Sequence, residues 1–160
     1  MQALKRNAKA TLLAVDVSQS ALDRLLFNAK ENGVAERVEV LKTDFFKEKN
    51  FLGSKRFDVV ISDPPALTSS AKQAAECRRA LQQCFDAAIA KLAPNGIAAL
   101  ASCSFHLTWD EFLVCVARAG STNGQTLKVT HLGAQSADHP VLSTLLETRY
   151  LKSAIVEALV

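Results

Sequence analysis

The sequence predicts an α/β fold with a mainly parallel sheet. Short apolar runs that suit buried strands alternate along the chain with longer segments whose apolar residues recur at helical spacing. Such alternation builds right-handed strand–helix–strand crossovers, which make the strands parallel and place helices on both faces of the sheet. The 160 residues, 49% of them apolar, suffice for a single core. We therefore expect one domain that extends over residues 1–160.

The first half of the chain contains three strand candidates, which are Thr11–Val15, Arg37–Thr43 and Phe57–Ser62. The run Asp58–Ser62 has the apolar character of a strand that is buried on both faces. A helix is expected between the first two strands, because Leu22 and Ala29 belong to a series of apolar residues at helical spacing. Ser18 suits the N-cap of this helix, and Gly33 suits its end.

The second half begins with a predicted helix over about Ala71–Leu92, which the turn Pro94–Gly96 is expected to stop. Ile97–Ala101 is the next buried strand. Thr108 and Glu111 have the spacing of a capping box, so another helix should start there. Two final strands are expected on either side of a long polar loop that contains Asp138, His139 and Pro140: Thr126–Leu132 and Tyr150–Leu159.

Composition and charge narrow the class of protein. The formal charge of +3, from 19 basic and 16 acidic side chains, permits RNA binding but does not argue for it. No apolar run approaches the roughly 20 residues of a membrane span. The four cysteines show neither the paired spacing of a zinc site nor the density of a disulfide scaffold. We therefore expect a cytoplasmic protein with reduced thiols, without a metal and without a membrane partner.

Four polar side chains lie at or just past the carboxyl ends of predicted strands: Asp16, Asp44, Asp63 and Cys103. In open α/β sheets, ligands bind in the crevice beyond these strand ends. We therefore expect the four side chains to face one crevice.

The three carboxylates have different interpretations. Asp16 follows a strand and precedes a helix, where an acidic side chain can accept both hydroxyls of a ribose, or act as an additional helix cap. Asp44 is placed to accept a hydrogen bond from the exocyclic amine of an adenine, but it could equally be an aspartate of a surface turn. Asp63 precedes Pro64 and Pro65, which hold the backbone close to extended values and so fix the direction of the carboxylate, as catalysis requires. The alternative is that these residues only form the turn that ends the strand.

Cys103 follows a buried strand in the run Ala-Ser-Cys-Ser. A cysteine is more often an inert core residue than a nucleophile, but the position at a strand end favours the nucleophile here. The helix that opens near Thr108 could turn its N-terminus toward this thiol and lower its pKa. Core packing is the better account of the other three cysteines, Cys77, Cys84 and Cys115. His106 lies near Cys103 in the sequence, but it is the less favoured interpretation that it acts as a base.

Several segments together resemble class I S-adenosylmethionine-dependent methyltransferases: VDVSQSALDRLLFNAKENG, LKTDFF, FDVVISDPPA, LAPNG and ASCSFHLTWDEF. More narrowly, ASCS and the terminal DHPVLSTLLETRYLKS resemble bacterial 23S ribosomal RNA cytosine-C5 methyltransferases that carry an N-terminal PUA domain. The resemblance implies a Rossmann-like class I sheet with an antiparallel C-terminal strand, S-adenosylmethionine as cofactor and ribosomal RNA as substrate. It also implies roles for the strand-end residues. Asp16 and Val17 would bind the cofactor ribose, and Asp44 with Phe45 would border the adenine. Asp63, Pro64 and Pro65 would hold the target base, and Cys103 would be the nucleophile.

Two features of the family are expected to lie outside this chain. Its glycine-rich loop, which follows the first strand, should precede Met1, so that Gln2–Ala8 would be the tail of the next helix. The PUA domain is also missing. Without the first strand, two backbone edges would be exposed. We therefore expect a partial catalytic domain that binds cofactor weakly, with a homodimer as a candidate assembly.

Two other functions fit parts of the sequence. An enzyme that methylates an amino nitrogen of adenine or cytosine also uses a polar residue before two prolines, but an aromatic residue usually follows them, and Ala66 stands here. A noncatalytic fragment whose exposed strand edges serve assembly is the second alternative.

Overall fold

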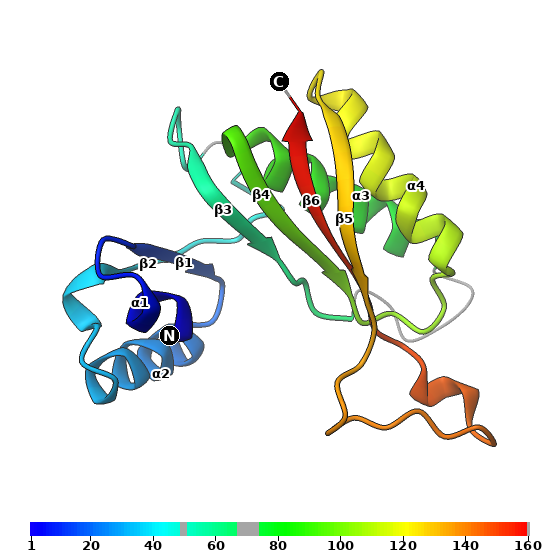
Figure 1. Cartoon of the computed structure of the whole chain (residues 1–160), viewed down its shortest axis with the longest axis horizontal. Helices are drawn as coiled ribbons and strands as arrows, with labels where there is room; N and C mark the ends of the chain where they lie inside the picture. The colour runs from blue at the N-terminus through cyan, green and yellow to red at the C-terminus, as the bar shows by residue number, and fades with distance from the viewer. Residues whose placement is uncertain (49–50, 67–73, 160) are drawn as a thin grey trace. The chain divides into compact units, whose positions relative to one another are not determined.

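The computed structural model describes residues 1–48, 51–66 and 74–159, which form two compact units, Met1–Gly53 and Ser54–Val160. The first unit contains α1 (Gln2–Arg6), β1 (Leu12–Asp16), α2 (Gln19–Glu31), the 3-10 turn Ala35–Arg37 and β2 (Val38–Lys42) (Figure 1). β1 and β2 pair in parallel from Leu12↔Val38 to Asp16↔Lys42. Their carboxyl ends are therefore adjacent, as the crossover through α2 requires.

A small apolar cluster holds the first unit together. Leu4 of α1, Ala29 of α2 and Val38 of β2 are buried in it. The Arg37 guanidinium donates to the carbonyl oxygens of Leu4 at 2.8 Å and of Ala10 at 3.0 Å, which fixes α1 against the start of β2.

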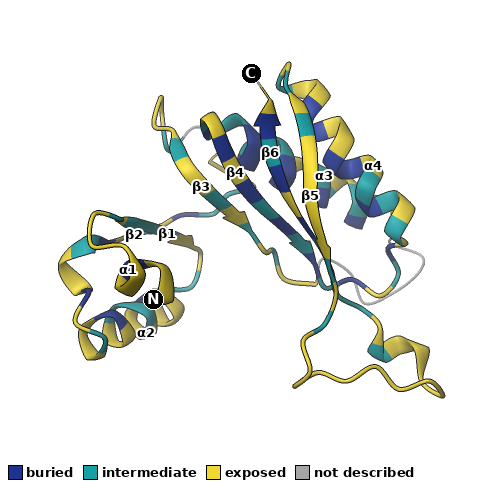
Figure 2. Cartoon of the chain, viewed as in Figure 1, coloured by how far each residue is buried: buried dark blue, intermediate teal, exposed yellow. Residues whose placement is uncertain are grey.

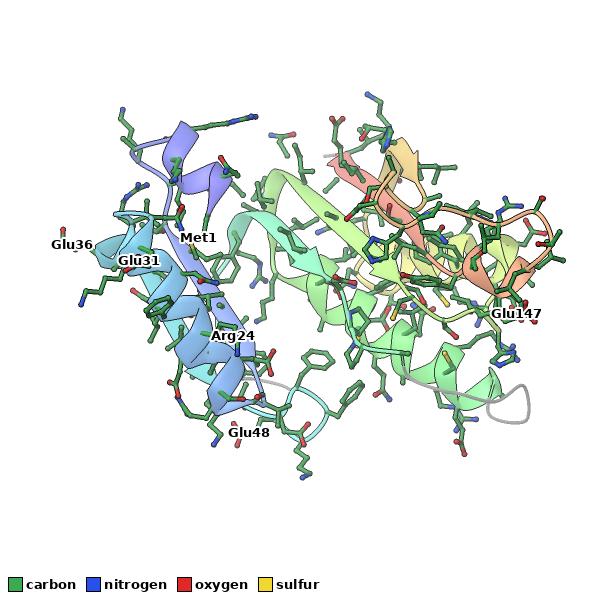
Figure 3. The ribbon with its side chains drawn as sticks, turned by 90° about the horizontal axis from the view of Figure 1, so that it is seen from below. Met1, Arg24, Glu31, Glu36, Glu48 and Glu147 are labelled. Carbon is green, nitrogen blue, oxygen red and sulfur yellow. The ribbon has the colours of Figure 1, made fainter. Side chains whose placement is uncertain are left out.

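The N-cap predicted for α2 is confirmed. The Ser18 hydroxyl accepts a hydrogen bond from the backbone N–H of Ala21 at 3.3 Å, and Gly33 follows the helix with a φ of 67°. The charged side chains of Arg24 and Glu31 lie on the exposed side of this helix (Figure 3).

The second unit is a four-stranded sheet in the order β3-β4-β6-β5, with two helices (Figure 1). Its elements are β3 (Phe57–Ser62), α3 (Ala74–Ala90), β4 (Leu92–Ser102), α4 (Trp109–Thr122), β5 (Thr126–Gly133), the 3-10 turn Leu146–Thr148 and β6 (Lys152–Leu159). β3 pairs in parallel with β4, whereas β6 runs antiparallel to both β4 and β5. The predicted fold class, with its antiparallel C-terminal strand, is confirmed.

α3 and α4 pack against one face of this sheet and against each other. The rings of Phe85 and Phe112 meet edge to face with centroids 5.6 Å apart, and both side chains are fully buried. Leu100 of β4 and Val156 of β6 close the core from the sheet side. Burial of each such side chain stabilises the fold by roughly 1.5–3 kcal/mol. Among the described residues, no helix has the length and apolarity that crossing a membrane requires.

The opposite face of this sheet carries exposed apolar side chains, which corrects one prediction. The run Asp58–Ser62 is not buried on both faces, because Val59 is 59% exposed and Ile61 is 73% exposed. Figure 2 shows exposed positions along β3. Among the described residues of the second unit, α3 and α4 lie on the same face of this sheet (Figure 1). Both crossovers, from β3 to β4 and from β4 to β5, advance in the same direction across the sheet, so the right-handed rule places both helices on one side.

The turn Pro94–Gly96 does not stop the helix, contrary to the prediction. α3 ends at Ala90, and Pro94–Gly96 lies inside β4. There the register with β3 shifts between Phe57↔Leu92 and Val59↔Ile97, so β4 bulges, with Asn95 at a φ of 60°. Residues 71–73 of the predicted helix lie outside the described residues.

Within the described ranges, β1 pairs only with β2, and β3 pairs only with β4. Each of these strands therefore has one backbone edge without a neighbouring strand. The two exposed edges predicted from the sequence are confirmed for the part of the chain that the structure describes.

Candidate active site

The structure brings Asp63 and Cys103 to the same pocket of the second unit. Asp63 follows β3 and Cys103 follows β4, and these strands are parallel neighbours, so both side chains lie at the same end of the sheet. The pocket has a volume of about 380 Å³, within the range of roughly 300–1,000 Å³ typical of small-ligand sites. It is lined by Asp63, Pro64, Pro65, Cys103, Gln135, Ser136, Asp138, His139, Tyr150 and Leu151.

The turn that carries Cys103 is anchored on both sides by buried serines. Ser102 and Ser104 are 4% and 3% exposed, and the Ser104 N–H donates to the Ser102 hydroxyl at 3.4 Å. Cys103 between them is half-buried, and its Sγ lies 3.9 Å from the carbonyl oxygen of Pro64. The thiol is therefore held against the Asp-Pro-Pro turn while it still reaches the pocket.

Lys152 is a buried cation behind this turn. It is 4% exposed, and its Nζ donates to the carbonyl oxygens of Ser104 and Tyr150, each at 3.0 Å. Burial lowers the pKa of Lys152 below its ordinary value. The ammonium group fixes the backbone that follows Cys103 to the start of β6.

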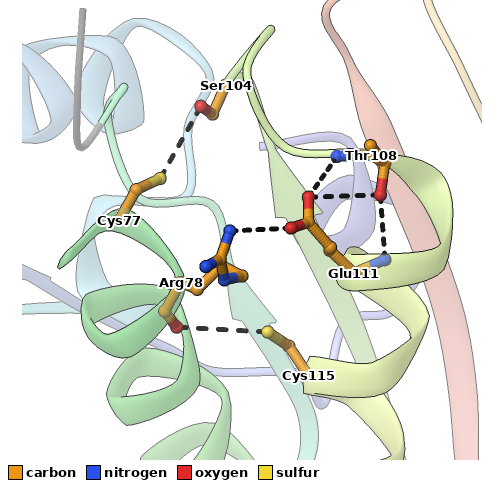
Figure 4. A network of polar contacts seen from close by, with 6 residues as sticks. All are labelled: Cys77, Arg78, Ser104, Thr108, Glu111 and Cys115. Carbon is orange, nitrogen blue, oxygen red and sulfur yellow. Dashed lines mark hydrogen bonds and ion pairs between the residues drawn. The ribbon is translucent and has the colours of Figure 1, made fainter. Parts of the chain in front are cut away.

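The pKa of Cys103 is raised, so the prediction of a thiol activated by the α4 N-terminus is wrong. Burial is the main cause, the nearby Asp63 carboxylate raises the pKa further, and Lys152 lowers it. α4 satisfies its own first turn instead. The Glu111 N–H donates to the Thr108 hydroxyl at 3.2 Å, and the Thr108 N–H donates to the Glu111 carboxylate at 2.9 Å (Figure 4).

A chain of polar contacts links this capping box to α3 (Figure 4). The Arg78 guanidinium forms an ion pair with Glu111 at 2.7 Å, and Cys77 Sγ lies 3.6 Å from the Ser104 hydroxyl. The hydrogen bond from the Thr108 N–H, above all, lowers the pKa of Glu111. These contacts fix the two helices and the Cys103 turn relative to one another.

The other cysteines have the core positions that the sequence predicted. Cys77, Cys84 and Cys115 are all buried, and burial raises the pKa of Cys84 to about 11. His106, the less favoured candidate for a base, packs its ring against Phe105 with centroids 5.5 Å apart.

Asp16 and Asp44 lie together at the carboxyl edge of the first unit. The Thr43 N–H donates to the Asp16 carbonyl at 3.1 Å, which joins the two strand ends. The Asp16 carboxylate accepts the Ser18 N–H at 2.7 Å and so also contacts the start of α2. Val17 beside it is 63% exposed.

Asp44 is tied into its own turn. It accepts the Phe46 N–H at 3.0 Å and pairs with Lys47 at 3.2 Å, and the Lys47 contact above all lowers its pKa. The ring of the neighbouring Phe45 packs edge-on against Phe46 and Phe51. A shared crevice for Asp16, Asp44, Asp63 and Cys103 stays a prediction.

Several pocket residues come from the loop 134–151, part of which resembles the family but to which no site residue was assigned from the sequence. Asp138, His139 and Tyr150 all line the pocket of Cys103. The signal that could have found them is the adjacent acid–base pair Asp138 and His139 within a polar stretch of this loop.

Comparison with known proteins decides the family. The profile described as "Methyltransferase domain" matches residues 1–144 of this chain. The chain belongs to the methyltransferase domain family. This agrees with the class I S-adenosylmethionine-dependent methyltransferase that the sequence predicts.

Curated relatives of this methyltransferase domain carry the name "Ribosomal RNA large subunit methyltransferase I". The protein from Aeromonas salmonicida is 34% identical over 160 residues, which cover 98% of this chain and 40% of the relative. The protein from Klebsiella pneumoniae strain 342 is 34% identical over 142 residues, which cover 87% of this chain and 36% of the relative. The chain thus spans about two fifths of the length of these relatives.

Solved structures confirm the fold of the methyltransferase domain. SMU.776, solved in complex with SAH, superposes with a TM-score of 0.75 at 15% identity, over 92% of this chain and 39% of that one. TrmN from Thermus thermophilus superposes with a TM-score of 0.63 at 17% identity, over 99% of this chain and 40% of TrmN. S-adenosylmethionine, the cofactor predicted from the sequence, agrees with the family and with the SAH in SMU.776.

Proposed function

We propose that this chain is the greater part of the catalytic domain of an RNA methyltransferase that forms 5-methylcytosine in large-subunit ribosomal RNA. The observation that carries the proposal is the shared pocket of Cys103 and Asp63. The relatives' name, which refers to large-subunit ribosomal RNA, supports the choice of substrate.

The cytosine ring explains why a thiol is needed. C5 of cytosine is a poor nucleophile, so the Cys103 thiolate first adds to C6 and converts the ring into an enamine. Asp63 hydrogen-bonds the N3 and amino edge of the base and stabilises the charge that develops in this adduct. Pro64 and Pro65 hold Asp63 in place, and the Tyr150 ring in the same pocket offers a surface on which an extruded base can stack.

Residues of the first unit suit the cofactor. Asp16 offers a carboxylate at a strand end for the ribose hydroxyls, with the exposed Val17 beside it, and Asp44 with Phe45 lies at the adjacent strand end for the adenine. S-adenosylmethionine supplies the methyl group when it is bound. The tight turn contacts of Asp44 leave Asp16 as the better ribose ligand of the two carboxylates.

The location and assembly follow from the same proposal. A ribosomal RNA substrate is consistent with a cytoplasmic, RNA-binding enzyme, and the four unpaired cysteines support a reducing compartment. The edge of β3 is the surface that we assign to a homodimer.

The experiment is transfer of labelled methyl groups to large-subunit ribosomal RNA, followed by nucleoside analysis, with S-adenosylmethionine raised to millimolar concentration because this chain is expected to bind it weakly. The wild-type chain should yield 5-methylcytidine, Cys103→Ala should yield none, and Cys115→Ala should retain the product. Methylated amino nitrogens that persist in Cys103→Ala would support the amino methyltransferase instead. No transfer by the wild-type chain even at this cofactor concentration would support a noncatalytic fragment.

A further inference from the structure

C5 methylation ends with a proton transfer for which the sequence identifies no base. After C5 has received its methyl group, it still carries its original proton, and the Cys103–C6 bond cannot break until a base takes that proton. A second cysteine beside the two prolines could serve as this base, but the turn Ser62–Ala66 contains none. If the proposed function holds, another group must therefore act as this base.

The loop 134–151 supplies an acid–base pair to the pocket of Cys103. Asp138 and His139 both line this pocket, and the His139 Nδ1 lies 3.3 Å from the Asp138 carboxylate. Their side chains are 74% and 61% exposed, so both remain accessible to a bound base. The Ser136 hydroxyl, which also lines the pocket, donates a hydrogen bond to Asp138.

These contacts orient the imidazole ring. The Ser136 hydroxyl first, and then His139, lower the pKa of Asp138 and keep it a carboxylate. A carboxylate beside Nδ1 favours the tautomer that carries its proton on Nδ1, which leaves Nε2 as the proton acceptor. This is how an acidic residue prepares a histidine to act as a general base.

Other groups near Cys103 suit the task less well. Lys152 is buried and donates to two carbonyl oxygens, so it is not an acceptor. Asp63 is assigned to hydrogen bonds with the N3 and amino edge of the base, so its carboxylate is already engaged. His131 belongs to β5 and is not among the residues that line the pocket.

We propose that His139, oriented by Asp138, is the general base that removes the C5 proton. His139 Nε2 takes the proton, the electrons of the C5–H bond form the C5–C6 double bond, and the C6–S bond breaks to release the Cys103 thiolate. Product and free enzyme result, and the imidazolium then returns its proton to solvent. No oxidant or further reactant is required.

The test separates proton removal from the steps before it. Without a base, the methylated adduct should persist, so His139→Ala should lower steady-state turnover about 100-fold, a typical general-base contribution. It should also accumulate a denaturant-resistant protein–RNA complex that contains labelled methyl groups. Wild type and the matched control His131→Gln should turn over without this complex.

RNA that contains 5-fluorocytidine distinguishes the two proposals, because fluorine at C5 cannot leave as a cation. Wild type and His139→Ala should both form the covalent complex with this RNA, since addition at C6 does not need the base. Failure of the wild type to do so overturns the proposed function. Normal turnover by His139→Ala, or lost turnover without a trapped adduct on cytidine RNA, overturns only the role of His139.

Discussion

The surroundings of Cys103 disfavour the ionised form of its thiol. Burial and the Asp63 carboxylate raise its pKa, and Lys152 is the charge that opposes them. A thiolate is the reactive form, so the rate of addition to C6 should rise with pH until the raised pKa is passed. Alkylation of this thiol should speed up with pH in the same way, because it also requires the thiolate, so its rate measures how far Cys103 is ionised.

Lys152→Met should raise the pKa of Cys103, because it removes the nearby positive charge. At a pH below that pKa, the rate of Cys103 alkylation by iodoacetamide should fall severalfold, where one pKa unit corresponds to about tenfold. Mass spectrometry can follow Cys103 separately from the buried cysteines, with Lys152→Arg and the exposed Lys128→Met as controls. Faster alkylation in Lys152→Met would mean that Lys152 serves only to hold the turn.

At the scale of single elements, the sequence correctly predicted those features that depend on residues close together in the chain, such as helix starts. The Thr108–Glu111 spacing located the start of α4, and Ser18 located the start of α2, because both caps form within four residues. The open face of β3 was not predictable in this way, since exposure of Ile61 depends on which side of the sheet the crossover helices occupy. The place of His139 in the pocket likewise depends on the tertiary return of its loop to β6.

Thr108→Ala tests the capping box of α4. The substitution removes the acceptor for the Glu111 N–H and a partner of the Glu111 carboxylate, and should lower the free energy of unfolding by about 1 kcal/mol. Urea denaturation followed by circular dichroism measures this loss. The exposed Thr122→Ala at the other end of α4 should change stability by less than about 0.5 kcal/mol. Equal effects of the two substitutions would refute a specific capping contribution.

At the scale of the whole molecule, the distribution of glycine predicts weak cofactor binding. The first glycine in the sequence is Gly33, so β1 and the turn at Val17 have no glycine that would let the backbone approach the methionine moiety. We expect isothermal titration calorimetry of this chain with S-adenosylmethionine to give weak or undetectable binding. Tight binding would refute this, and Asp16→Ala should then abolish it.

The edge of β3 should make the protein a dimer. β3 exposes Val59 and Ile61 beside Ile97 of β4, a continuous apolar surface next to an unpaired backbone edge. Sedimentation should therefore give a dimer for the wild type and a monomer for Ile61→Lys. Phe27→Lys, at the similarly exposed Phe27 of α2, should remain dimeric. A monomeric wild type, or a dimer that survives Ile61→Lys, would exclude association through this edge.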